Sequence, residues 1–197
     1  MDKKGWRERA LARRCLGDAG PNPPANLALI TGLVGLLPGA GETVAGFLSF
    51  GAEPDTGPLL RGLIGHGLSL LLPAPGPKRT AIEWGLVHLA SCALPVTQPG
   101  TLVEPPPPRL PAQALAQCQL VLVPALVVDR TGTRLGRGGG WYDKALRYSA
   151  AGAIILAVVY PTEVLPAGTL PSAPHDFRVH GALTGAGVEL FGTLGKI

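Results

Sequence analysis

The sequence has little charge and few aromatic side chains. Only 15% of its 197 residues are charged and 5% are aromatic, whereas 46% are hydrophobic. This hydrophobic content excludes the kind of disorder that arises from low hydrophobicity, and it suffices for one sizeable core. We therefore expect a single domain over residues 1–197, which is an ordinary domain length.

Cysteine is also scarce. Cys15, Cys92 and Cys118 lie far apart and form no Cys-x-x-Cys pair. An odd number of cysteines without metal-ligand spacing argues against a disulfide framework or a cysteine-ligated metal. We expect three reduced thiols that pack structurally in a cytoplasmic protein and take no part in chemistry.

A long apolar run is absent too. Residues 19–41 carry no charge, but four prolines interrupt them, and their apolar part, residues 25–37, has only 13 residues. A membrane-spanning helix needs about 20. We therefore expect a buried helix here and no membrane partner. The charges before it extend to Arg14, which is unlike a secretory signal.

The net charge of +4 comes from one segment. Residues 1–14 hold six basic and two acidic side chains, and the other 183 residues hold eleven of each. A nucleic-acid-binding protein usually spreads its basic residues over a face and interleaves them with aromatic side chains. The charge distribution therefore predicts no nucleic-acid partner, but a basic N-terminal helix that meets a small anion.

The hydrophobic pattern predicts an α/β fold. Helices are expected at residues 3–16, 25–37, 56–66 and 141–151, and strands at residues 43–50, 68–73, 119–124 and 153–160. Strand–helix–strand order implies right-handed parallel crossovers, and strands that are apolar on both faces belong to a covered parallel sheet. Gly and Pro together make up 49 residues, which we interpret as turns, with a stiff proline-rich connection over residues 95–111.

The most informative segment is a glycine-rich turn between a predicted strand and a predicted helix. Its four glycines at residues 136–140 allow backbone N–H groups to converge on an anion. Arg134 and Arg137 supply guanidinium groups that suit phosphate or carboxylate, and Asp143 is placed to hold a cation such as Mg²⁺. These neighbours favour an anion site over a turn in which glycine serves the backbone alone. The segment is neither a Walker A motif nor a dinucleotide fingerprint.

Three further places carry candidate groups. Glu53 follows the strand at residues 43–50, at the edge where α/β sheets bind ligands, although a capping or solvated glutamate is the alternative. Lys3 and Arg7 lie four residues apart on one helix face and could both reach one phosphate chain, with a solvated face as the alternative. His175, Asp176 and His180 match no strong metal signature, so we favour a structural role for the histidines.

In the order and spacing of these residues the sequence resembles the 5-formyltetrahydrofolate cyclo-ligase (5,10-methenyltetrahydrofolate synthetase) family. The specific match is Arg134-Leu-Gly-Arg-Gly-Gly-Gly-Trp-Tyr-Asp143. The match extends to Lys3-x-x-x-Arg7, Phe47-Leu-Ser with Glu53-Pro-Asp-Thr56, Gln98-Pro-Gly100, His175-Asp176 and Ala182-Leu-Thr184, whereas residues 17–45 and 74–118 match only loosely. The resemblance implies an open, mostly parallel sheet with helices on both faces, of the NagB/RpiA/CoA-transferase-like kind, in a single domain.

The resemblance also implies an activity. The expected reaction converts 5-formyltetrahydrofolate to 5,10-methenyltetrahydrofolate and turns ATP into ADP and phosphate, with Mg²⁺ as the metal. Its partners would be 5-formyltetrahydrofolate and ATP, and the enzyme would be a monomer or weak dimer. Two alternatives stay open: a non-enzymatic folate- or nucleotide-binding module, and a sugar-phosphate isomerase on a similar sheet.

Residue roles follow from the same resemblance. ATP would be bound by Lys3, Arg7, Arg134, Leu135, Gly136, Arg137, Gly138, Gly139, Gly140, Trp141 and Tyr142. The folate would be bound by Leu48, Glu53, Arg137, Gly138, Gly139, Gly140 and Trp141; Arg137, Trp141 and Tyr142 would be catalytic; Asp143 and Asp176 would hold Mg²⁺. Trp141 replaces the first tyrosine of a Tyr-Tyr-Asp common in the family, which keeps a stacking surface but removes a phenol hydroxyl.

Overall fold

The computed structural model describes residues 1–17, 39, 41–75, 82–88, 105, 107–174 and 176–192. The helix expected at residues 25–37, His175 and most of the proline-rich connection lie outside these ranges. Among the helices of the described residues, none is long and apolar enough to cross a membrane.

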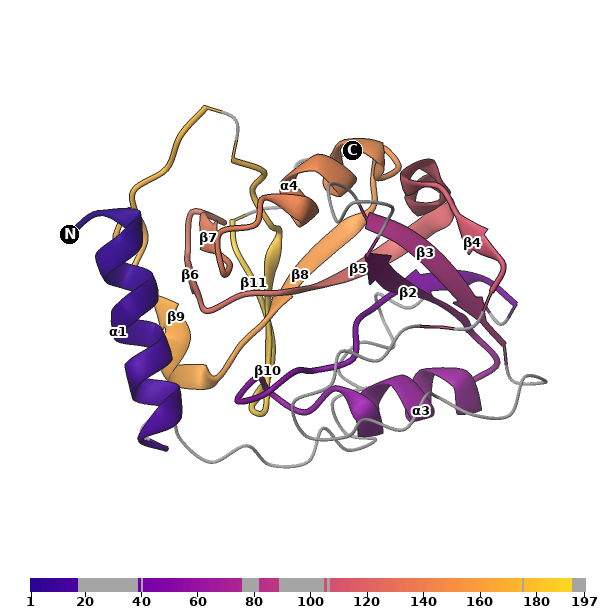
Figure 1. Cartoon of the computed structure of the whole chain (residues 1–197), viewed down its shortest axis with the longest axis horizontal. Coiled ribbons are helices and arrows are strands. Elements are labelled where there is room, and N and C mark those ends of the chain that lie inside the picture. Colours follow the sequence, from indigo (N-terminus) through magenta and orange to yellow (C-terminus); the bar gives the residue numbers. More distant parts are fainter. Residues whose placement is uncertain are drawn as a thin grey trace.

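An eight-stranded sheet forms the centre of the protein, with the strand order β11-β10-β8-β5-β1-β2-β3-β4 (Figure 1). The strands are β1 (Thr43–Ala45), β2 (Ser69–Pro75), β3 (Ile82–Val87), β4 (Arg109–Leu110), β5 (Cys118–Pro124), β8 (Ile154–Val158), β10 (Gly181–Thr184) and β11 (Gly187–Leu190). The five strands from β10 to β2 pair in parallel, whereas β3, β4 and β11 are antiparallel additions at the edges. The mostly parallel sheet is therefore confirmed.

Helices cover both faces of this sheet, as expected. Helix α3 (Gly57–Gly65) connects β1 to β2 on one face, and α4 (Trp141–Ala145) lies on the other with the 3₁₀ helices η3 (Ala112–Gln117) and η4 (Leu146–Tyr148) (Figure 1). Side chains alternate along β5: Leu120 packs in the core beside α3, and Val121 packs in the core beside α4 and η4. Both layers of the core are thus built by strands that are apolar on both faces.

A second, three-stranded sheet supports the N-terminal helix. It consists of β6 (Val127–Asp129), β7 (Arg134–Leu135) and β9 (Val164–Leu165), in the order β7-β6-β9. Helix α1 (Lys3–Cys15) lies alongside it and buries Ala10 in a cluster with Leu126 and Leu135 (Figure 1). This contact fixes the position of the basic helix beside the glycine-rich segment, which begins in β7.

Two predicted elements are less than half as long as expected. The strand at residues 43–50 ends at Ala45, because Thr56 then holds the chain by side-chain hydrogen bonds: its Oγ1 accepts from Ser49 N at 3.0 Å and donates to Phe47 O at 2.6 Å. The helix at residues 141–151 is α-helical only to Ala145 and continues as η4. The 3₁₀ turn ends where both the backbone N–H and the hydroxyl of Ser149 donate to the carbonyl of Leu146.

The two cysteines that the structure describes differ in burial, and Cys92 lies outside the described residues. Cys118 is buried in the core, and burial raises the pKa of its thiol to about 12. Cys15 is exposed at the end of α1, so the expectation that it packs structurally is wrong. The last turn of α1 presents Arg14, not Cys15, to the core.

Candidate active site

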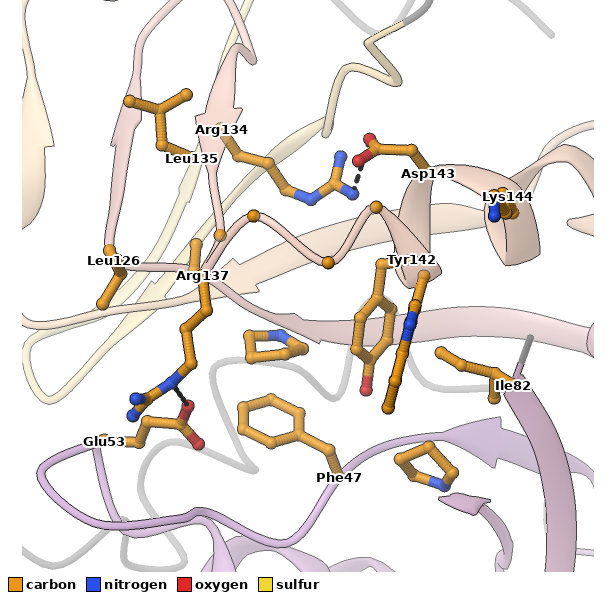
Figure 2. Close-up of a pocket in the computed structure, with 18 of the residues that line it drawn as sticks. Phe47, Glu53, Ile82, Leu126, Arg134, Leu135, Arg137, Tyr142, Asp143 and Lys144 are labelled. Carbon is orange, nitrogen blue, oxygen red and sulfur yellow. Dashed lines mark hydrogen bonds and ion pairs between the residues drawn. The ribbon is translucent and has the colours of Figure 1, made fainter. Parts of the chain in front are cut away.

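A cavity of about 840 Å³ lies at the carboxyl ends of the central parallel strands, beneath the glycine-rich segment (Figure 2). It is lined by every site residue proposed from the sequence: Lys3, Arg7, Leu48, Glu53, residues 134–143 and Asp176. These residues come from α1, the segment after β1, the segment from β7 into α4, and the loop before β10. The structure therefore brings together groups that are up to 173 residues apart in sequence.

At one end of the cavity Arg134 and Asp143 form an ion pair. Asp143 lies in the first turn of α4, and its Oδ1 accepts from Arg134 Nη2 at 2.9 Å and from Phe177 N at 3.4 Å (Figure 2). Arg134 is 8% exposed and donates through Nη1 to Phe177 O at 2.6 Å. Arg134 thus holds the start of α4 against the loop that carries Asp176.

The basic face of α1 reaches the same end. Lys3 Nζ pairs with Asp176 Oδ2 at 2.5 Å, and Ala173 N donates to the same oxygen at 2.6 Å. One turn further along, Arg7 donates from Nε to Gly136 O at 3.0 Å. Lys3 and Arg7 therefore share one helix face, as expected, and that face lines the cavity instead of being fully solvated.

Another side of the cavity is formed by Glu53 and Arg137 (Figure 2). Glu53 Oε1 accepts from Arg137 Nε at 3.3 Å, and Oε2 accepts from Phe50 N at 2.9 Å. The Glu53 side chain is 11% exposed, whereas Arg137 is 47% exposed and lies 5.7 Å from the centre of the Phe50 ring. Glu53 is therefore more than a solvated glutamate: it is a nearly buried carboxylate held in a fixed orientation.

Two glycines of the segment adopt backbone conformations that other residues rarely adopt. Gly138 has a φ of 100° and Gly140 a φ of 65°, both in the range that L side chains rarely adopt. At Gly138 a Cβ would lie 3.6 Å from the Arg7 guanidinium carbon. The backbone thus turns sharply into α4 while staying close to the basic face of α1.

Tyr142 points into the cavity from the first turn of α4 (Figure 2). Burial raises the pKa of its phenol, and the charge of Glu53 raises it further, while Arg134 acts in the opposite direction. The hydroxyl therefore stays protonated at neutral pH and can donate a hydrogen bond. Trp141, beside it, supplies an aromatic surface to the same cavity.

The acidic groups of the cavity suit one kind of cation. Among the described residues there is no group of three or more His, Cys, Asp or Glu side chains placed to hold a metal. Two carboxylates, Asp143 and Asp176, do lie at the end beside the basic groups. Mg²⁺ commonly takes one or two protein carboxylates and completes its shell with water and substrate phosphates. This donor set fits Mg²⁺ accompanied by a nucleotide, and it does not fit a structural zinc site.

His180 has a structural role. Its Nδ1 accepts from Ile155 N at 3.0 Å, and burial lowers the pKa of the ring, in agreement with the structural role that we favoured.

Two basic residues of the cavity wall, Lys144 and Arg147, were not identified from the sequence. Lys144 directly follows Asp143, and no local sequence pattern distinguishes a lysine that lines a cavity from a lysine on an ordinary solvent-exposed face.

Comparison with known proteins agrees with this geometry. A model of the 5-formyltetrahydrofolate cyclo-ligase family matches residues 39–185. The 5-formyltetrahydrofolate cyclo-ligase of Mycolicibacterium smegmatis is 39% identical over 156 residues, which cover 74% of each chain. The mitochondrial 5-formyltetrahydrofolate cyclo-ligase of Arabidopsis thaliana is 28% identical over 156 residues, covering 69% of this chain and 56% of that protein.

Solved structures are similar in fold. The 5,10-methenyltetrahydrofolate synthetase of Aquifex aeolicus superposes with a TM-score of 0.68 at 21% identity, covering 100% of this chain and 96% of that one. The corresponding synthetase of Mycoplasma pneumoniae gives a TM-score of 0.60 at 17% identity, covering 91% and 96%. The family model matches most of the chain, and the Mycolicibacterium smegmatis enzyme is 39% identical to it over 74% of each chain. The chain therefore belongs to the 5-formyltetrahydrofolate cyclo-ligase family and is an enzyme of that family.

Proposed function

We propose that the enzyme converts 5-formyltetrahydrofolate to 5,10-methenyltetrahydrofolate, using ATP and Mg²⁺ and releasing ADP and phosphate. One observation carries this proposal beyond family membership. A single cavity combines a cationic end, formed by Lys3, Arg7 and Arg134, with a nearly buried carboxylate, Glu53, on another wall. The first suits a polyphosphate and the second suits the N–H edge of a pterin.

The reaction needs both ligands in one place. The formyl oxygen on N5 is a poor leaving group, so the γ-phosphoryl group is transferred to it and ADP departs. The N10 nitrogen then attacks the activated carbon, its proton is lost, and the oxygen leaves as inorganic phosphate. Catalysis of such a step consists mainly of positioning and of neutralising the charge on the transferred group.

The chain's own residues supply these two functions. Lys3, Arg7 and Arg134 bind and neutralise phosphate oxygens, and Arg137 reaches from the glycine-rich segment toward Glu53, between the two ligands. Trp141 stacks on the folate, and the protonated hydroxyl of Tyr142 donates a hydrogen bond to the reacting oxygen. Mg²⁺ would be held by Asp143 and Asp176, and it would supply positive charge that helps to neutralise the phosphate groups.

Family membership argues against the two alternatives considered from the sequence. A non-enzymatic module would bind folate or ATP and raise the melting temperature without forming product. A sugar-phosphate isomerase would act without ATP, so tight ATP binding would argue against it. Both alternatives therefore predict results that differ from those of a cyclo-ligase in the same assay.

The assay follows the absorbance of 5,10-methenyltetrahydrofolate with purified protein and 5-formyltetrahydrofolate. We expect product only when ATP and Mg²⁺ are both present, with one ADP formed for each product molecule. Omission of ATP, or removal of Mg²⁺ by a chelator, should abolish product formation. Product without ATP, or no product from folded protein in the complete mixture, would refute the proposal.

A further inference from the structure

The loop that carries Asp176 connects β9 to β10 and reaches out beside the N-terminal end of α1 before it returns (Figure 1). Its middle is held at the cavity by the contact of Lys3 with Asp176. Both ends of the loop are buried: Leu170 is 6% exposed and Val179 is 4% exposed. Whatever fixes these two ends therefore determines where the loop presents Asp176 to the cavity.

The first end is held by a buried carboxylate that has no part in the site described so far. Asp129, the last residue of β6, is fully buried, and its Oδ2 accepts from Leu170 N at 2.9 Å. Its Oδ1 accepts from Thr131 N at 2.9 Å and from Thr131 Oγ1 at 2.5 Å. Burying a carboxylate is costly unless hydrogen bonds replace its water. These bonds commit one oxygen of Asp129 to the turn of residues 129–133 and the other to the start of the Asp176 loop.

The second end is held by the same turn, through its glycine. Gly132 N donates to Asp129 O at 2.8 Å, and Gly132 O accepts from Val179 N at 2.9 Å. Gly132 has a φ of 81°, and a Cβ there would lie 2.3 Å from Val179 O. Only glycine therefore lets the turn approach the loop this closely. One turn of five residues thus binds both ends of the Asp176 loop.

The two ends pack in separate parts of the protein. Leu170 lies in the cluster beneath α1, with Ala10, and Val179 lies in the core layer that contains Ala145 of α4. The turn of residues 129–133 joins these two attachments. It is therefore placed to hold the loop against both walls of the cationic end, the wall that α1 forms and the wall that α4 forms.

We propose that this turn is a positioning element for the metal site: Asp129 and Gly132 set the place of Asp176, and through it the affinity of the enzyme for ATP with Mg²⁺. This inference rests on the proposed function, in which Asp176 holds Mg²⁺. Neither Asp129 nor Gly132 is among the described residues that line the cavity, so both act through the loop. Loss of a group that orients a metal ligand typically lowers metal affinity by about 10- to 100-fold.

The test uses two variants of the turn. In Gly132→Ala the new methyl group must displace Val179, and in Asp129→Asn one of the two acceptors becomes a donor that faces other donors. Thr131→Val, which removes a hydroxyl that donates to Asp129, is a milder variant of the same turn.

The matched control is Gly41→Ala. Gly41 has a φ of 91°, and a Cβ there would meet no atom within 4 Å. It precedes β1, so it lies at the end of the sheet away from the cavity. The control therefore shares the backbone strain of Gly132→Ala without displacing the loop.

Hydrogen exchange in the free protein reports on the loop directly. The amides of Ala173, Asp176 and Phe177 are hydrogen-bonded within the loop or to Asp143. We expect them to exchange about tenfold faster in both turn variants than in wild type, because the loop opens more often when its ends are displaced. In Gly41→Ala they should exchange at the wild-type rate.

Titrations followed by tryptophan fluorescence measure the effect on the ligands. Affinity for ATP with Mg²⁺ should fall about tenfold in the two turn variants. Affinity for ATP with a chelator, and affinity for 5-formyltetrahydrofolate, should stay at wild-type levels. A fold that is merely loosened would weaken all three.

A double-mutant cycle with Asp176→Asn decides whether the turn acts through this carboxylate. In the Asp176→Asn background, Gly132→Ala should cause no further loss of affinity for ATP with Mg²⁺. Additive losses would overturn the proposal, since the turn leads directly into β7 and would then act through Arg134. Unchanged exchange in the loop, equal effects in Gly41→Ala, or wild-type ATP affinity that does not depend on Mg²⁺ would overturn it as well.

Failure of the proposed function gives a different result. In that case wild-type protein forms no product from 5-formyltetrahydrofolate in the complete mixture. Hydrogen exchange in the free protein needs no ligand, so it still decides whether Asp129 and Gly132 hold the Asp176 loop in place.

Discussion

Arg14 and Glu163 form a buried ion pair that fastens α1, the helix that bears Lys3 and Arg7, to the rest of the protein. Arg14 Nε and Nη2 donate to the two carboxylate oxygens of Glu163, each at 2.7 Å, and the two side chains are only 1% and 4% exposed. Arg14 Nη2 also donates to Ala125 O at 2.7 Å, beside the cavity. The pair thus fixes how far α1 extends along the cavity, and with it the positions of Lys3 and Arg7.

Replacement of Arg14 by Met should strongly destabilise the fold, because Glu163 is left as a buried, unpaired charge. We expect the free energy of unfolding to fall by about 3–5 kcal/mol in urea titrations. Addition of Glu163→Gln should restore at least half of the loss, since the charge is gone and the amide oxygen can still accept from Tyr160 N. A double variant no more stable than Arg14→Met would contradict this account. Lys4→Met, which breaks an exposed pair with Glu8, should change stability by less than about 0.5 kcal/mol.

Arg137→Ala should impair the reaction and not the fold. Arg137 lines the cavity and is 47% exposed, so its removal leaves the core intact. We expect kcat/KM for 5-formyltetrahydrofolate to fall by about 10²–10³, the usual effect of removing a group that stabilises transition-state charge. The urea midpoint should stay within error of wild type, and Arg61→Ala should retain full activity. Turnover that survives Arg137→Ala would remove this residue from the mechanism.

Gly140→Ala should destabilise the protein through backbone conformation alone. The φ of Gly140 is 65°, and a Cβ there would meet no atom within 4 Å, so strain and not crowding sets the effect. We expect a loss of about 1–2 kcal/mol in the free energy of unfolding. Gly136→Ala is the matched control, since its surroundings are equally open and its φ is not in the left-handed range. Equal losses at the two positions would show that the backbone argument is wrong.

The raised pKa of Tyr142 predicts a fall in stability at high pH. Unfolded chains release the phenol proton near pH 10, whereas the folded protein still holds it, so the unfolded state is favoured as pH rises above that value. Each such tyrosine contributes a slope of about 1.4 kcal/mol per pH unit.

Urea titrations between pH 9 and pH 11 measure this effect. Tyr142→Phe should show a shallower decline than wild type, while a smaller decline remains, because burial also raises the pKa of Tyr160. Tyr148 is 42% exposed, so Tyr148→Phe is the comparison at an exposed site. A decline in Tyr142→Phe as steep as in wild type would argue against a partly buried, protonated Tyr142.

The central sheet could be predicted because its strands carry their own signal. Segments such as residues 119–124 are short, largely apolar on both faces and ended by a proline, which is the pattern of a covered parallel strand. The edge strands lack that signal. Strand β4 has two residues, and the three strands of the small sheet have two or three, too few for any periodicity. Their pairing depends on partners far along the chain.

The same distinction applies to the candidate site. Its main residues could be predicted because the glycine-rich segment brings ten of them to one place by sequence alone, residues 134–143. The buried position of Arg14 could not be predicted, because the sequence does not distinguish it from the solvent-facing arginines of α1. Only the fold places Glu163, 149 residues away, against it. Lys144 and Arg147 were missed for a related reason: only the fold determines which surface of α4–η4 borders the cavity.

The contact between Lys3 and Asp176 determines when the site can exist during synthesis. The two residues are 173 positions apart, so the first helix leaves the ribosome long before its partner loop is made. Until residue 176 has emerged, the end of the cavity that bears Lys3 and Arg7 lacks one of its two carboxylates. We expect ribosome-bound chains that expose only the first 160 residues to lack tight ATP binding, since the basic face of α1 then has no closing loop.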